Sequence, residues 1–234
     1  MYLSVMGIQQ QMVNDSPDHV EFSKNLAVTQ RNLGNIEFRQ QNFDRAAGYY
    51  TESRKRLTQL GIANQRTDIR LDIAALSRSI GDCFFQTAEK DQAKAEYITA
   101  KKYYKLLSEK VCFEQLSAEL GLLRTSLTMG QIEQEQQEYA RARKEFESIL
   151  TTIEALPEEH KRSAAFLDIK AVALSNQALV LVKSENRVKK AERLTQEAIG
   201  IAKDLNRRYP KTKRFANLLD QLQTQLRLIL NSSN

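Results

Sequence analysis

Three arginines recur at related positions along the chain, and the arginine side chain is well suited to hold a carboxylate. Arg31 and Arg78 occupy the same column of a repeated pattern, and Arg124 falls one helical turn before the next equivalent position. Arginine presents a planar fork of N–H donors that can grip a carboxylate through two hydrogen bonds. Together they predict a site for a carboxylate-bearing peptide. For each arginine taken alone, an ordinary solvated charge is the better interpretation.

The same spacing supplies the other side chains of this predicted site. Residues four and seven positions apart lie on one face of a helix. We therefore expect Arg31 and Arg78 each to share a helix face with a polar and an aromatic side chain that follow it. The predicted partner-binding residues are Arg31, Asn35, Phe38, Arg78, Asp82, Phe85 and Arg124.

The sequence shows no signature of catalysis. It has neither a glycine-rich phosphate loop nor a Gly-x-Ser-x-Gly turn. The two histidines, His19 and His160, are expected at the surface near helix starts. The two cysteines, Cys83 and Cys112, are too widely spaced for a metal site and too few for a disulfide framework. We expect no enzymatic activity, no cofactor and no metal.

These side chains belong to a pattern that recurs at a nearly constant interval along the chain. Glycine stands at positions 34, 81 and 130, alanine twelve positions later, and an aromatic residue four after that. A fourth, weaker copy has Ala178 and Ala191 at the corresponding places. Self-similarity at a fixed period of this size indicates stacked helical repeats. We expect the small residues to lie where two helices cross closely, because bulk there would push the backbones apart.

The order of these columns resembles the tetratricopeptide repeat over nearly the whole chain, although the interval here is longer than the usual one for that family. The resemblance implies a right-handed superhelix whose first helices line a concave groove. Long repeats of this kind resemble the tetratricopeptide tails of bacterial signalling proteins such as serine/threonine kinases. The groove is partly similar to the carboxylate clamp of chaperone-binding members, with Arg31, Asn35 and Arg124 at matching columns. Ser79 and Thr128 stand where that clamp has asparagine and arginine.

The expected fold is all-α, a single solenoid of about four long helical hairpins. Only three prolines and eight glycines among 234 residues favour long helices. A half-repeat at 1–14 precedes the hairpins, and Ser16-Pro17-Asp18 is typical of a helix start. A capping helix with a leucine stripe ends the chain at 212–231. The four hairpins are expected at 17–60, 67–108, 113–155 and 162–208.

Composition suggests an intracellular protein, and we expect a cytoplasmic location. The start of the sequence lacks the basic head and cleavage site of a signal peptide. We expect no membrane-spanning helix, which needs about 20 apolar residues, and therefore no membrane partner. Cys83 is expected to be a buried small hydrophobe, and Cys112 to open the next first helix.

The net charge of +6 is concentrated near the C-terminus, where residues 183–214 carry eleven Lys or Arg and four Asp or Glu. Such a basic end invites a nucleic-acid or anionic-surface interpretation. Single-strand binders normally add aromatic stacking platforms, and only Tyr209 and Phe215 are near. We therefore favour the interpretation that these basic residues keep the chain soluble and do not bind nucleic acid. The residues in question are Arg187, Lys189, Lys190, Arg207, Arg208, Lys211, Lys213 and Arg214.

The N-terminal segment reads as the second helix of a repeat whose first helix is absent. Tyr2 precedes Tyr50 by one repeat interval, and Val5, Met6 and Met12 give the segment an apolar face. We expect this face to be covered by a preceding repeat of a longer polypeptide or by a second copy in a homodimer.

The sequence therefore predicts a non-catalytic scaffold that binds a peptide or protein partner in its concave groove. Two alternatives remain open. The chain is a regulatory or targeting segment of a larger signalling protein, or its basic end binds nucleic acid or another anionic surface.

Overall fold

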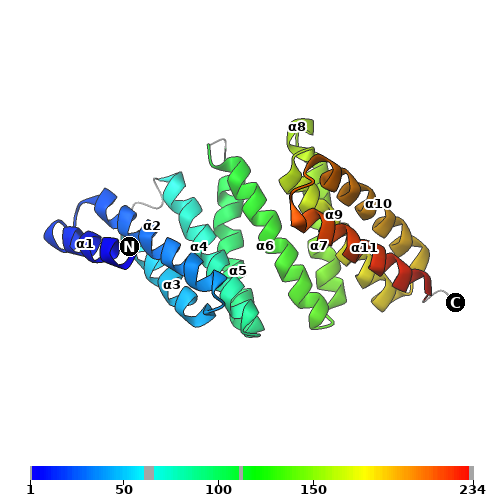
Figure 1. Cartoon of the computed structure of the whole chain (residues 1–234), viewed down its shortest axis with the longest axis horizontal. Helices are drawn as coiled ribbons and strands as arrows, with labels where there is room; N and C mark the ends of the chain where they lie inside the picture. The colour runs from blue at the N-terminus through cyan, green and yellow to red at the C-terminus, as the bar shows by residue number, and fades with distance from the viewer. Residues whose placement is uncertain (1, 61–65, 111–112, 232–234) are drawn as a thin grey trace. The chain divides into compact units, whose positions relative to one another are not determined.

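The computed structural model describes residues 2–60, 66–110 and 113–231, and all regular secondary structure within them is helical. These described ranges contain eleven helices, which are labelled in Figure 1. The predicted all-α fold is confirmed. The chain forms two compact units, Met1–Thr125 and Ser126–Asn234, and the boundary falls within one long helix, α6.

Unit 1 is built from consecutive helices that pack as hairpins. Helix α2 packs against α3, α4 against α5, and α3 also packs against α4, while α1 lies on α2. The helices are α1 (Tyr2–Asp15), α2 (Val20–Arg39), α3 (Phe43–Gln59), α4 (Thr67–Gln86), α5 (Lys90–Ser108) and the first part of α6 (Gln115–Glu135).

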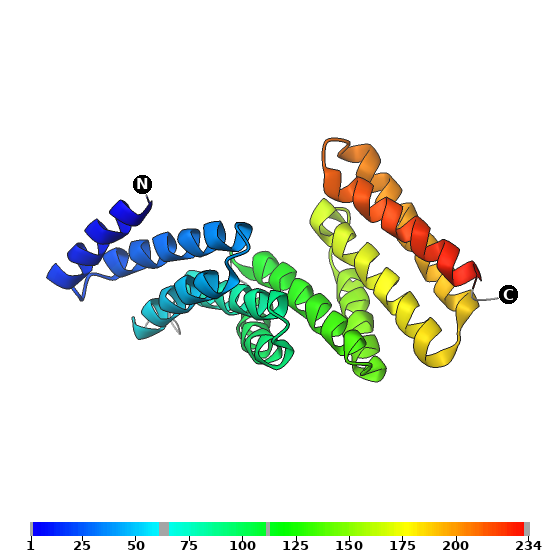
Figure 2. The ribbon, with the colours of Figure 1, turned by 60° about the horizontal axis from the view of Figure 1, so that its bottom comes forward.

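Unit 2 is also built from helices that pack as hairpins. Helices α9 and α10 form a hairpin, α11 packs on α10, and α7 packs on α9, as Figures 1 and 2 show. The helices are α7 (Tyr139–Ala155), α8 (Glu158–Lys161), α9 (Ala164–Glu185), α10 (Val188–Arg208) and α11 (Lys213–Asn231), with the last part of α6.

Each hairpin turns at a residue in the left-handed backbone region. The residues are Gln41, Ala88, Gln137 and Asn186, with φ of 64°, 64°, 62° and 49°. They follow the glycine or alanine of the first helix by seven or eight positions, so the turn repeats with the pattern. A left-handed residue lets the chain reverse directly after a helix, because the following N–H can bond to a carbonyl of the last turn.

The glycine column makes room for the aromatic column. A Cβ placed on Gly81 would lie 2.7 Å from Cε1 of Tyr97, and one on Gly34 would lie 2.5 Å from Cε1 of Tyr50. We expected the glycine to face the repeated alanine across a helix crossing. The alanines are buried as expected, but the nearest side chain over the glycine is the ring. Gly121 likewise makes room for Tyr104 of the preceding hairpin: a Cβ placed on Gly121 would lie 2.4 Å from Cε1 of Tyr104.

Some expected details differ. Helix α2 begins at Val20 with His19 as its N-cap, so Pro17 lies in the preceding turn and not at the first helical position. The His19 N–H donates to the Ser16 carbonyl in that turn. The short helix α8 was not expected. The predicted end of a helix at Gly61 and the predicted start at Cys112 lie outside the described residues.

Helix α9 corrects the expectation that no segment is apolar enough for a membrane. Over 18 residues its mean hydropathy reaches 1.5, so length and composition alone would allow it to cross one. Half of that window is buried within the protein, including Phe166, Ile169 and Leu174. Packing against α7 and α10 accounts for the composition of α9 as a core helix.

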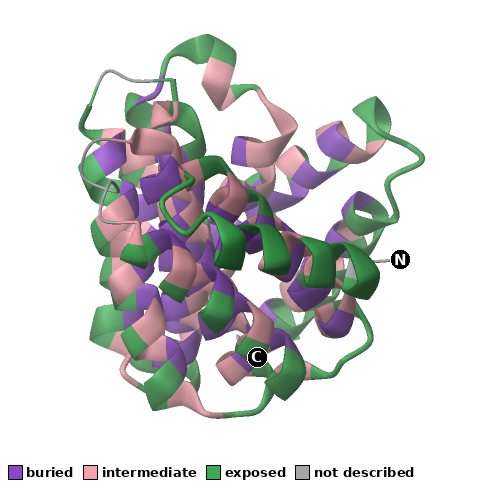
Figure 3. Cartoon of the chain, turned by 90° about the vertical axis from the view of Figure 1, so that its left-hand side faces the viewer, coloured by how far each residue is buried: buried purple, intermediate pink, exposed green. Residues whose placement is uncertain are grey.

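Helix α1 keeps an exposed apolar face. Val13 is buried toward α2, whereas Leu3 and Ile8 are 61% and 65% exposed and Met12 is 39% exposed. Figure 3 views the molecule from the side on which α1 lies and shows how much of this helix is exposed.

Candidate partner-binding surfaces

Two of the predicted arginines, Arg31 and Arg78, already hold carboxylates from their own chain. The Nη1 of Arg31 on α2 donates to Oδ1 of Asp72 on α4 at 2.6 Å. Arg78 on α4 donates to Oδ2 of Asp82, one turn later on the same helix, at 2.8 Å. These pairs are partly buried, and a carboxylate ligand at either arginine would compete with an internal partner.

The residue after each of the first two glycines accepts a hydrogen bond from the ring packed on that glycine. The hydroxyl of Tyr50 donates to Asn35 at 2.9 Å, and that of Tyr97 donates to Asp82 at 2.8 Å. In the third copy the ring is Phe146, which has no hydroxyl. Asn35 and Asp82 therefore help to hold the hairpins together.

Asp82 is the centre of a polar cluster between α4 and α5. Arg78 and Tyr97 both donate to its carboxylate, and Arg78 also hydrogen-bonds to Tyr104. The pKa of Asp82 is raised, because the effect of burial is larger than the opposing effects of Arg78 and Tyr97, which lower it. Burial also raises the pKa of Tyr97, and the nearby carboxylate adds to the shift. These hydrogen bonds make the cluster part of the packing between α4 and α5.

The two predicted phenylalanines and Arg124 have different surroundings. The rings of Phe38 and Phe43 meet edge to face at the turn of the first hairpin, with centroids 5.2 Å apart. Phe85 is half-buried near the end of α4. Arg124 is exposed on α6, close enough to Tyr104 to lower the pKa of that tyrosine, a minor effect beside burial, which raises it. The structure thus brings Arg78 and Asp82 together, with Arg124 exposed on α6 near Tyr104 of the same cluster.

The surroundings of Cys83 and His19 do not favour reactivity. Cys83 is 1% exposed, and burial raises the pKa of its thiol to about 12, so the thiol stays neutral at pH 7. The ring of His19 stacks on Phe22 at 3.8 Å. Among the described residues there is no group of three or more His, Cys, Asp or Glu arranged to hold a metal ion.

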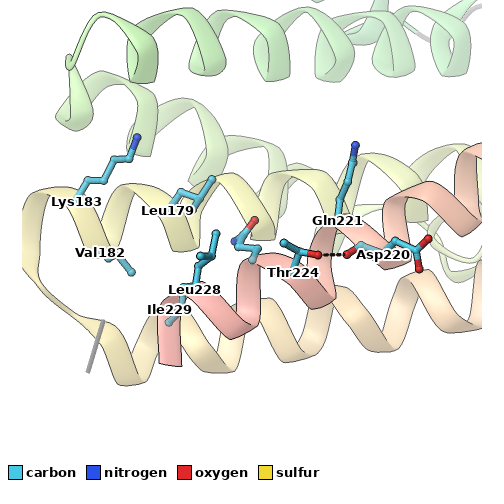
Figure 4. Close-up of a pocket in the computed structure, with 9 residues that line it drawn as sticks. Leu179, Val182, Lys183, Asp220, Gln221, Thr224, Leu228 and Ile229 are labelled. Atoms are coloured by element: carbon cyan, nitrogen blue, oxygen red, sulfur yellow. Dashed lines mark hydrogen bonds between the residues drawn. The ribbon is translucent and has the colours of Figure 1, made fainter. Parts of the chain in front are cut away.

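An apolar groove of about 550 Å³ lies between α9 and α11 in unit 2. Its apolar lining comes from Leu179 and Val182 of α9 and from Leu228 and Ile229 of α11, which are labelled in Figure 4, and Ile229 is also a buried core residue. Leu228 is 66% exposed, although it is a large apolar side chain.

Hydrogen bonds hold the two walls of this groove in place. The hydroxyl of Ser175 on α9 donates to Oε1 of Gln225 on α11 at 2.6 Å, and Nε2 of Gln225 donates to the Ser175 carbonyl at 3.0 Å. Leu218 and Leu222 anchor α11 in the core below. The packing and hydrogen bonds of α9, α10 and α11 therefore fix the shape of the groove.

Charged and polar side chains border the apolar lining. Lys183 and Asp220 stand at opposite ends of the groove in Figure 4 and are both exposed. Gln221 and Thr224 lie between, and the hydroxyl of Thr224 donates to the Asp220 carbonyl at 2.9 Å. The arrangement suits a ligand with an apolar centre and charges at its two ends.

Sequence reasoning missed this groove although the signal was present. The predicted residues Arg31, Asn35 and Phe38 stand three positions before, one after and four after the glycine of their copy. Carried into the fourth copy, these inward columns fall on Ser175, Leu179 and Val182. Leu179 and Val182 line the groove, and Ser175 hydrogen-bonds to its opposite wall. The fourth copy matches the pattern most weakly, so the inward columns are clear only in the first three.

Several cations at the basic end are paired within the chain. Arg214 makes bonds of 2.7–3.1 Å to Asp168, and Arg207 and Arg208 both bond to Asp204. The two aromatics of this region, Tyr209 and Phe215, pack on each other with centroids 5.8 Å apart. These contacts weaken the interpretation of the basic end as a nucleic-acid surface.

Comparison with known proteins places the fold among helical repeat proteins. No protein-family model matches the sequence, and no curated protein matches it either. Among solved structures, BtubC (BKLC) from P. vanneervenii is similar with a TM-score of 0.62 and 14% identity, over 99% of this chain and 86% of that one. The yeast histone chaperone Hif1 has a TM-score of 0.52 and 12% identity, over 89% and 96%. At such identities the likeness is one of fold.

Proposed function

We propose that this chain is a non-catalytic scaffold of the tetratricopeptide type that binds a segment of a protein partner between α9 and α11. One observation carries the proposal: the inward columns of the fourth repeat line an apolar groove in which Leu228 is two-thirds exposed. An exposed apolar patch with a polar border is typical of a binding site. Hif1, similar in fold, is described as a scaffold that recruits protein complexes to core histones.

The groove favours a partner segment with a particular order of side chains. Its centre would bury apolar residues against Leu179 and Leu228. An acidic residue at one end would face Lys183, and a basic residue at the other would face Asp220. Charges at the border direct the orientation of a bound segment more than they add affinity.

The set predicted in unit 1 remains a second, separate hypothesis. A carboxylate ligand there would have to displace Asp72 from Arg31 or Asp82 from Arg78. We also propose a cytoplasmic location and a role within a signalling assembly, in which this chain serves as the recruiting segment.

Photo-crosslinking in the native cell tests the α9–α11 groove. Benzoylphenylalanine in place of Leu228 is expected to form a discrete adduct with one protein, identified by mass spectrometry. The same photo-probe in place of Ile98 is the control, because Ile98 is 59% exposed on α5 and lies outside the groove.

The crosslink should disappear when Leu179 is replaced with aspartate, because binding would then bury a charged carboxylate in an apolar site, which costs free energy. An adduct that forms equally well from position 98, or one that survives Leu179→Asp unchanged, would count against the groove.

A further inference from the structure

The outer side of α1 carries a narrow apolar stripe. Val5, Ile8 and Met12 follow one another at intervals of three and four residues, so their side chains lie along one side of the helix. Their exposed fractions are 38%, 65% and 39%, whereas Val13, which faces α2, is buried. Figure 3 shows the outer side of α1 exposed along the helix. The described residues of unit 1 therefore cover this stripe only in part.

The same columns are covered in the complete hairpins. Val5 precedes Ser53 by the offset that relates Tyr2 to Tyr50. Ser53 is 1% exposed, and its hydroxyl donates at 2.7 Å to the carbonyl of Ala27 on α2, the first helix of its own hairpin. A helix is therefore the kind of element that fits against the stripe of α1. The column of Met12 holds leucines that are buried or half-buried: Leu60, Leu107, Leu156 and Leu205.

Two other columns show that α1 is poorly matched to a first helix of this repeat. The column of Val5 holds a small residue in three of the four copies, which lets the two helices of a hairpin approach closely. The column of Gln9 is apolar and buried in all four copies: Leu57, Tyr104, Ile153 and Ala202. Valine and glutamine break these two rules. The spacing of the stripe itself, three residues and then four, is that of the seam between two helices of a coiled coil.

The charges of α1 are complementary to a second copy of the same helix. Asp15 is the only residue of α1 that is charged at pH 7, and it ends the helix. The helix dipole favours a negative charge at the N-terminus and disfavours one at the C-terminus. Helix α1 has no acidic residue in its first turn and no basic residue in its last turn.

An antiparallel pair of α1 helices improves both ends at once. Each Asp15 would lie beside the N-terminus of the other helix, where the dipole favours its charge. The same pairing places Val5 opposite Met12 of the second copy and Ile8 opposite Ile8. One arrangement therefore covers the apolar stripe and reverses the unfavourable placement of Asp15.

We propose that two copies of this chain associate through α1 in an antiparallel pair with two-fold symmetry, with Ile8 of each copy near the axis. Such a contact uses the same surface of both copies and is closed, so that association stops at a dimer. The proposal does not depend on the α9–α11 groove, and each of the two can fail without the other.

Sedimentation equilibrium of the full chain tests this proposal. We expect monomer and dimer in equilibrium with a dissociation constant of about 1–100 µM, as suits a small interface. Ile8→Asp should weaken association by at least about tenfold, because it buries two carboxylates together in an apolar contact. Leu3→Asp is the matched control and should change the dissociation constant by less than about twofold. Leu3 is 61% exposed on the same helix but points to another side of it.

Two results of this experiment would overturn the proposal. One is a chain that stays monomeric at concentrations well above the expected dissociation constant. The other is an equal loss of association in Ile8→Asp and Leu3→Asp.

Cysteine crosslinking tests the arrangement of the two helices. With Cys112 replaced by serine, Ile8→Cys should give a disulfide-linked dimer under mild oxidation, and Leu3→Cys should not. An equal mixture of Val5→Cys and Met12→Cys should give mainly the mixed dimer, because an antiparallel pair brings these two positions together. No dimer from Ile8→Cys, or an excess of the self-linked dimers in the mixture, would contradict the antiparallel pair.

Discussion

Replacing Gly81 with leucine should lower the free energy of unfolding by about 1–3 kcal/mol, the usual cost of overpacking a core. The reason is local: a Cβ at this position would stand 2.7 Å from the ring of Tyr97, which is fully buried and cannot move aside freely. Urea denaturation of the full chain, followed by circular dichroism, measures the change.

Gly200 is the matched control for this substitution. It also lies in the middle of a helix, but nothing lies within 4 Å of a Cβ placed on it. Gly200→Ala should raise the free energy of unfolding by about 0.5–1 kcal/mol, because alanine is the better helix former. An unchanged denaturation midpoint in Gly81→Leu would show that the ring does not depend on the glycine.

Removing the hydroxyl of Tyr97 should also destabilise unit 1 strongly. Tyr97→Phe leaves Asp82 with one donor fewer in a partly buried cluster, and a hydrogen bond to a charged group contributes about 1.5–3 kcal/mol. Tyr50→Phe is the matched comparison, because the acceptor there is the neutral amide of Asn35, which is exposed. Its loss should cost about 1 kcal/mol or less.

Thermal denaturation of both variants distinguishes the two cases. The Tyr97→Phe protein should melt several degrees below the Tyr50→Phe protein, since about 1 kcal/mol shifts the melting temperature of a domain of this size by roughly 2–4 °C. Equal melting temperatures would mean that the Asp82 cluster contributes no more than an exposed contact.

The helical pattern was predictable because it depends on local rules. Small and aromatic residues at fixed intervals specify where helices can pack closely, and Gly81 with Tyr97 shows the pairing in the structure. The ion pair between Arg31 and Asp72 was not predictable in the same way. Asp72 stands nine positions before the glycine of its own repeat, outside the repeated columns, and only the packing of α4 on its neighbours brings it to Arg31.

The candidate groove was predictable in part for a related reason. Leu179 and Val182 follow the repeated columns, so their inward position could be inferred from the first three copies. Leu228 and Ile229 belong to the capping helix, which lies beyond the four copies of the repeated pattern. Their position in the lining of the groove depends on how α11 packs on α10, and the repeated pattern alone does not specify that packing.

Calorimetric titration of the crosslinked partner's segment into the full chain tests the proposed function most directly. Leu228→Asp should weaken binding by at least about tenfold, because losing the burial of one leucine costs roughly 1.5–3 kcal/mol. Ile98→Asp, the same change at a similarly exposed apolar residue of α5, should alter the affinity by less than about twofold. If both variants bind like the parent, or if Ile98→Asp has the larger effect, the α9–α11 groove is not the surface that binds the partner.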